Sequence, residues 1–88
     1  MYQRNGISLE QAAQRVADFL QVNVEEIWLH RKQPTVVEAR SLLCFWATRE
    51  MGISATAVAI RLGLSLSAVS RAAWRGEQLA TGKGWQLK

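Results

Sequence analysis

Apolar residues recur at three- and four-residue intervals through the first part of the chain, which is the spacing of helices with one buried face. One such segment covers residues 9–20. Ser8 and Gln11 form a capping-box pattern at its start, so we predict that the first helix begins there. Asn23, with Glu26 three residues later, predicts the start of a short second helix.

A polar break separates these two helices from a long apolar one. Pro34 disfavours a helical conformation at the residue before it, so the break is predicted at residues 30–34. Thr35 and Glu38 form a second capping-box pattern, which predicts that the third helix starts at Thr35. Apolar residues then cover much of the helix circumference to about Met51. A helix of this kind is predicted to be central to the core.

Small residues mark the ends of the next helix. Gly52 is predicted to stop the third helix in a left-handed conformation. Ser54 is predicted to cap a fourth helix over residues 55–62, and Gly63 to end it.

The fifth helix is predicted to begin at Ser65 or Leu66 and to run to about Leu79. Gly76 is a weak point in this segment and is able to end the helix early. No segment alternates between apolar and polar residues as a strand would. The sequence therefore predicts an all-α fold, a compact bundle of about five helices in a single domain spanning residues 1–88.

The last two helices have the pattern of a helix-turn-helix over about residues 54–76. This motif needs a small residue in its first helix, where the second helix crosses closely, and Ala59 stands there. It also needs a glycine at the turn, where the backbone takes a positive φ, and Gly63 supplies it. Apolar residues suited to locking the two helices together are Val58, Leu62, Leu64, Val69 and Ala72. The fifth helix is therefore the predicted recognition helix, which would lie in the major groove of DNA.

The distribution of charge suggests a polyanionic partner. The formal net charge is +4. Residues 1–30 carry two arginines and four carboxylates, whereas residues 31–88 carry nine Lys/Arg and three carboxylates. From Arg61 to Arg75 there are three arginines and no acid. Basic charge gathered in one part of a small chain favours nucleic acid as the partner, and the alternative is a solvated face that happens to be basic.

The predicted DNA contacts lie on the fifth helix, at the start of the fourth, on the third, and in a basic loop at about residues 30–34. Serines near a helix start can donate to phosphates or base edges, and arginine grips guanine or a phosphate with two hydrogen bonds. A basic loop suits the flanking backbone or the adjacent minor groove. The complete set is Arg31, Lys32, Arg40, Ser54, Ser65, Ser67, Ser70, Arg71 and Arg75.

The tryptophans are given roles by their positions. Trp28 and Trp46 are predicted to anchor the core. For Trp74 two roles are open, stacking on the DNA or packing against the tail through Trp85, and we favour packing.

Other classes of function find little support in the residue types. One histidine, one cysteine and one tyrosine give no catalytic or metal-ligating cluster, so we predict no enzyme activity, metal or cofactor. The longest apolar run, Leu42 to Ala47, has six residues, against the roughly 18 that a membrane span needs. Cys44 lies in this run and is predicted to be a buried, inert thiol, which suits a reducing cytoplasm.

Several segments in order resemble the C-terminal DNA-binding domain (domain IV) of the bacterial replication initiator DnaA, a fold of the Trp-repressor type. They are Val16-Ala17-Asp18-Phe19, a short helix of the Val-x-Val-Glu-Glu-Ile type, the basic loop, Ala39-Arg40, Arg49-Glu50-Met51-Gly52 and the helix-turn-helix. The resemblance covers about residues 8–79. At the start of the fifth helix, initiators carry an Asp-His signature that reads the origin box, whereas this chain has Ser65-Leu66-Ser67-Ala68. The segments at residues 37–47 (Val-Glu-Ala-Arg-Ser-Leu-Leu-Cys-Phe-Trp-Ala) and 63–70 (Gly-Leu-Ser-x-Ser-Ala-Val-Ser) look closer to initiator-like domains at the C-terminus of IS200-type (tyrosine) transposase-like bacterial proteins.

The resemblance implies a double-stranded DNA-binding module that targets a larger transposase- or initiator-like protein to DNA. The alternative is a protein–protein interaction module built on the same helical fold, which would bind its partner through Trp74, Trp85 and the tail at residues 81–88.

Overall fold

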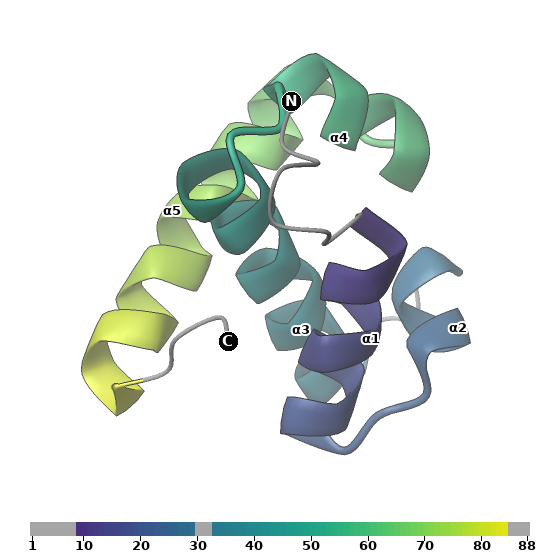
Figure 1. Cartoon of the computed structure of the whole chain (residues 1–88), viewed down its shortest axis with the longest axis vertical. Helices are drawn as coiled ribbons and strands as arrows, with labels where there is room; N and C mark the ends of the chain where they lie inside the picture. The colour runs from purple at the N-terminus through teal and green to yellow at the C-terminus, as the bar shows by residue number, and fades with distance from the viewer. Residues whose placement is uncertain (1–8, 30–32, 85–88) are drawn as a thin grey trace.

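The computed structural model describes residues 9–29 and 33–84, and every regular element in these residues is helical (Figure 1). The elements are α1 (Leu9–Leu20), α2 (Val24–Trp28), α3 (Pro34–Phe45), a π-helical turn η2 (Trp46–Glu50), α4 (Ala55–Leu62) and α5 (Leu66–Lys83). This confirms the predicted all-α fold with five helices.

Polar side chains cap three of the helices, α2 and α4 at the predicted caps and α5 at Ser65, one of its two predicted starting residues. The side-chain oxygen of Asn23 accepts a hydrogen bond from the backbone N–H of Glu25 at 2.9 Å and begins α2. The hydroxyls of Ser54 and Ser65 begin α4 and α5 by accepting from backbone N–H groups three residues on, each at 3.1 Å. Each cap satisfies an N–H that the helix itself leaves without a partner. The predicted cap at Ser8 lies outside the described residues.

The start of α3 differs from the prediction. Thr35 is not the cap, because α3 already begins at Pro34, with Gln33 as an N-cap that makes no side-chain hydrogen bond. Proline suits the first turn of a helix, since its φ is fixed at a helical value and its missing N–H would have had no partner there. Gln33 itself is extended (φ −62°, ψ 139°), as the following proline predicts.

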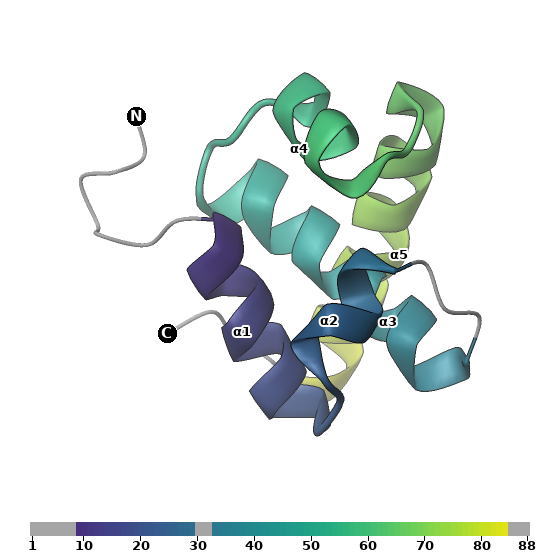
Figure 2. The same cartoon turned by 90° about the vertical axis from the view of Figure 1, so that its right-hand side faces the viewer.

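Helix α3 occupies the middle of the bundle. It packs against α1 and α2 on one side and α5 on the other, and Figures 1 and 2 show it between α1 and α5. Helix α4 lies at one end of the bundle and contacts α5 and η2. The buried core draws on all five helices and η2, and its α3 members are Val36, Ala39, Leu42, Leu43 and Cys44. The prediction of a central third helix is confirmed.

The chain leaves α3 through η2 and a left-handed glycine. The backbone N–H of Met51 donates to the carbonyl of Trp46 at 2.9 Å, which is the wider hydrogen-bond pattern of a π-helix. The spacing of apolar residues had predicted an ordinary α-helix over this segment. Gly52 then takes a φ of 72°, as predicted for the stop. This turn directs the chain into α4.

Helix α5 is longer than predicted, with 18 residues instead of an end near Leu79. Gly76 does not end it, because this residue is buried against α3, where only a glycine fits. The helix stops at Gly84, which has a φ of 71°. Tertiary packing thus outweighs the weak helix propensity of glycine.

The aromatic residues of the first half divide between core and surface. Trp46 is buried and anchors the core as predicted. Phe19 keeps 46% of its surface exposed and packs its ring 5.9 Å from that of Trp46. Trp28 is only half-buried, so it covers the edge of the core and does not fill its centre.

Candidate nucleic-acid interface

The turn between α4 and α5 has the predicted geometry. Gly63 takes a left-handed conformation with a φ of 69°, and the backbone N–H of Leu64 donates to the carbonyl of Ala59 at 2.9 Å. A residue with a β-carbon would be strained at this φ. The residues predicted to lock the two helices together are buried (Val58, Leu62 and Val69) or half-buried (Leu64 and Ala72), and Ala59, the predicted small residue, is buried. These contacts fix the direction of α5 relative to α4.

One face of α5 is buried and the opposite face is open to solvent. The buried face consists of Val69, Ala73, Gly76 and Ala80. The open face carries Ser67, Ser70, Arg71, Trp74 and Arg75, all exposed as predicted for a recognition helix. This face therefore offers hydroxyl and guanidinium donors and one indole to an incoming molecule.

Trp74 keeps 61% of its surface exposed, so the described residues leave most of its indole uncovered. The inward position is taken by Ala73, and one residue along a helix is a rotation of about 100°. The indole consequently shares the outer stripe with Ser70 and Arg71. Its predicted neighbour Trp85 lies outside the described residues.

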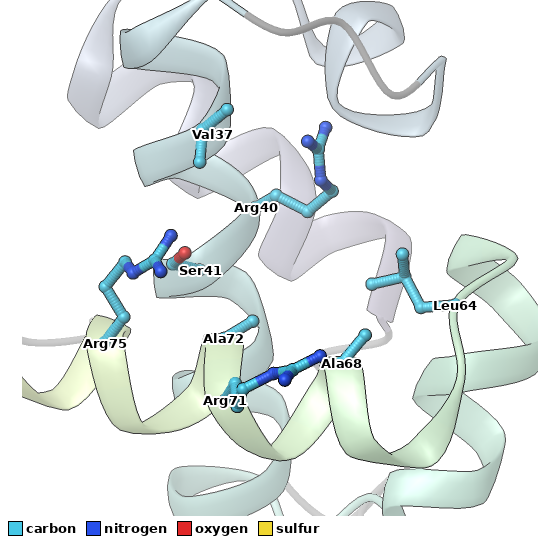
Figure 3. Close-up of a pocket in the computed structure, with 8 residues that line it drawn as sticks. All are labelled: Val37, Arg40, Ser41, Leu64, Ala68, Arg71, Ala72 and Arg75. Carbon is cyan, nitrogen blue, oxygen red and sulfur yellow. The ribbon is translucent and has the colours of Figure 1, made fainter.

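A cavity of about 210 Å³ lies between α3 and α5, and it brings three of the predicted arginines together (Figure 3). Its lining comprises Val37, Arg40 and Ser41 of α3, Leu64 of the turn, and Ala68, Arg71, Ala72 and Arg75 of α5. Figure 3 shows the small side chains between the two helices and the three guanidinium groups pointing in different directions around them. No carboxylate lines this cavity. Its surroundings therefore attract anions.

A second hollow, of about 330 Å³, continues along the outer face of α5. It is lined by Ser70, Arg71, Trp74 and Arg75. Arg71 and Arg75 therefore border both depressions. Because they share these two residues, the two depressions form one surface. We call it the α3–α5 surface, and it consists of the residues that line either depression.

The remaining arginines near this region are paired with carboxylates. Arg49 of η2 donates to Glu77 of α5 at 3.2 Å, so the acid of α5 is paired with a cation. Within residues 9–29 and 33–84, no ion pair involves Arg71 or Arg75. Their charges are available to a ligand.

Arg61 has a different role from the one its position in the acid-free stretch suggested. Its Nε donates to the carboxylate of Glu10 in α1 at 2.9 Å, and its guanidinium carbon lies 4.0 Å from the ring centre of Trp28. The hydrogen bond from Arg61 lowers the pKa of the Glu10 carboxyl below its ordinary value. Arg61 therefore ties α4 to α1 and α2, the first two helices.

The other predicted contacts are spread around this surface. Ser67 is exposed near the start of α5. Ser54 and Ser65 use their oxygens to cap α4 and α5 and do not line the cavities, although each hydroxyl proton is free to donate. Arg31 and Lys32 of the basic loop lie outside the described residues. Sequence reasoning had missed the contribution of Val37 and Ser41, since nothing local marks which face of α3 meets α5.

The described residues give little sign of a reactive thiol, a metal site or a membrane span. Burial raises the pKa of the Cys44 thiol to about 12, which matches the predicted inert cysteine. Among the described residues, no group of three or more His, Cys, Asp and Glu side chains is placed to hold a metal ion. None of the helices in that part of the chain is long and apolar enough to cross a membrane.

Comparisons with protein-family models, with curated proteins and with solved structures found no match to this chain. The charge and shape of the α3–α5 surface are therefore the basis on which a function is inferred.

Proposed function

We propose that the chain is a double-stranded DNA-binding module in which α4 and α5 form a helix-turn-helix and α5 enters the major groove. The observation that carries this proposal is the grouping of Arg40, Arg71 and Arg75 around one cavity without a carboxylate in its lining. Guanidinium groups bind phosphate oxygens with paired, charge-assisted hydrogen bonds. Neutralised phosphates release counterions, which supplies much of the affinity of DNA-binding proteins.

The arrangement of the three arginines favours a chain of phosphates over a single small anion. Arg71 and Arg75 are one turn apart on α5, about 6 Å along its axis, and Arg40 stands on a different helix. Their guanidinium groups point in different directions and do not converge on one point (Figure 3). Such a spread suits a backbone that passes along α5.

The first turns of α5 are suited to approach base edges. Ser67 and Ser70 are short, exposed and able both to donate and to accept hydrogen bonds. The first acid of α5, Glu77, comes late in the helix and is paired with Arg49. The recognition face therefore approaches the phosphates without an opposing carboxylate.

The wider role follows from the resemblance to initiator domains. We propose that the module targets a larger transposase- or initiator-like protein to DNA. Because Ser65-Leu66-Ser67-Ala68 replaces the Asp-His signature of initiators, the sequence it reads differs from a replication-origin box. The alternative, a protein-interaction module, is favoured by one observation, the exposed indole of Trp74.

The test is the salt dependence of duplex binding, measured by fluorescence anisotropy on a labelled duplex of random sequence. The logarithm of the binding constant should fall with the logarithm of salt concentration by about 0.9 per neutralised phosphate, so Arg71 and Arg75 alone predict a slope of about −1.8 or steeper. Arg71→Ala should make this slope shallower by about 1. Arg15→Ala is the matched control, since it removes the same charge from an exposed position on α1.

The proposal fails if the folded protein binds no duplex at low salt. It also fails if Arg15→Ala and Arg71→Ala weaken binding equally, because the α3–α5 surface would then have no special part in it. Circular dichroism of both variants confirms that the helices are intact.

A further inference from the structure

We propose that Trp74 is a stacking platform for an unpaired nucleobase, so that the module prefers a duplex that continues into a single strand. This inference rests on the proposed function and names the form of DNA that the same surface recognises. It begins from the indole of Trp74, which keeps 61% of its surface exposed in the middle of a helix whose other face is well packed.

The position of Trp74 along α5 places it away from the bases that a recognition helix reads. Recognition helices contact base edges with their N-terminal residues. Trp74 is eight residues beyond Leu66, the first residue of α5, which is about 12 Å along the axis. It therefore stands about two turns beyond the start of the helix, toward the margin of the groove in the proposed orientation.

An indole at that place has little to bind on a continuous duplex. Stacked base pairs present only their edges to the grooves, and their flat faces cover one another. An unpaired base exposes its face, and stacking of such a base on an aromatic side chain is sequence-tolerant. The chemistry of the side chain thus points to unpaired bases.

The neighbours of Trp74 supply the rest of a nucleotide site. Arg71 and Arg75 border the same hollow of about 330 Å³, and no ion pair within the described residues occupies either of them. A base on the indole would therefore have guanidinium groups beside its phosphates. The hollow is shallow and open to solvent, so the flat face of a base can reach the exposed indole.

An apolar patch of a partner protein is the competing occupant. Tryptophan and arginine are both enriched among residues that dominate protein interfaces. The two arginines carry unneutralised positive charge at the margin of the hollow, and that charge favours a polyanion over an apolar surface. We therefore assign the hollow to DNA.

The experiment compares two duplexes of identical sequence, one blunt and one extended by a short unpaired tail, with binding measured by anisotropy. The tail should raise the affinity about five- to 140-fold, the range that corresponds to about 1–3 kcal/mol of base–aromatic stacking at about 1.4 kcal/mol per factor of ten. Trp74→Ala should remove this gain, so that this variant binds the two duplexes with nearly equal affinity. Trp74→Phe should keep most of the gain, since it keeps an aromatic face.

The variants separate stacking from simple charge, because the phosphates of the tail act equally on all three proteins. If the wild type binds both duplexes with equal affinity, or if the gain survives in Trp74→Ala, the stacking inference is overturned while the proposed function stands; equal affinity would leave a protein partner as the occupant. If the wild type binds neither duplex at low salt, the proposed function itself is wrong and this inference falls with it.

Discussion

Gly76 of α5 faces the backbone carbonyl of Ser41 in α3 so closely that a β-carbon has no room between them. The same β-carbon would also lie 2.8 Å from the Cβ of Phe45. This contact lets the two helices approach at the end of the cavity bordered by Ser41 and Arg75. The glycine therefore helps to set the spacing of the α3–α5 surface.

Gly76→Ala should destabilise the fold by about 1–3 kcal/mol, because the obstructing atoms are helix backbone and a Cβ, which cannot move without shifting α3. The loss should appear even though alanine is the better helix former by about 1 kcal/mol. Urea denaturation followed by circular dichroism measures it.

Gly82→Ala is the matched control, since a β-carbon at Gly82 in the same helix meets nothing within 4 Å. This variant should be neutral or more stable by up to about 1 kcal/mol. Equal effects of the two substitutions would contradict the close crossing at Gly76.

What the sequence could predict is what local chemistry determines. Capping by Asn23 and Ser54, the start of the fifth helix at Ser65 or Leu66, and the left-handed turns at Gly52 and Gly63 depend on neighbours within a few residues, and the structure confirms them. The cap at Thr35 failed because the preference of proline for the first turn outweighed a second local signal.

What the sequence could not predict depends on residues far apart in the chain. The fit of Gly76 against Ser41 and the pairing of Arg61 with Glu10 both join distant segments. The α3–α5 surface has the same origin: Arg40 was a candidate for its charge, but only the crossing of α3 and α5 brings it beside Arg71.

The ion pair between Arg61 and Glu10 should make a small, pH-dependent contribution to stability. Because the pKa of Glu10 is lowered in the folded state, this contribution is fully present above the unfolded value of 4.5 and is lost as the pH falls through the folded pKa. Both side chains are about half exposed, so Glu10→Gln should cost only about 0.2–1 kcal/mol at pH 7.

Urea denaturation at neutral and acidic pH tests this prediction, and the difference between wild type and Glu10→Gln should disappear in acid. Glu50→Gln is the control, since Glu50 is an exposed acid that makes no ion pair within the described residues. A stability gap that persists in acid would show that Glu10 acts by packing and not by charge.

Cys44 should resist alkylation in the folded protein. The thiolate is the reactive form, and with a pKa of about 12 it is roughly one part in 10⁴ of the thiol at pH 8. Iodoacetamide should therefore modify the chain only after denaturation in guanidinium chloride, as followed by mass spectrometry. Rapid modification under native conditions would mean that the end of α3 opens locally. Because folding raises this pKa from 9.0, stability should also fall as the pH rises above about 9.

The cap at Ser65 allows folding and DNA binding to be separated. Ser65→Asp should preserve stability, because aspartate caps a helix about as well as serine and its charge suits the N-terminus of α5. The same charge would stand at the start of the proposed recognition helix and repel phosphates, so affinity for duplex DNA should fall several-fold at low salt. Asn23→Asp is the matched control, because it places the same new charge at an N-cap of α2. If Ser65→Asp binds as well as Asn23→Asp while both remain folded, the start of α5 does not approach the DNA backbone, and the proposed orientation of the recognition helix is wrong.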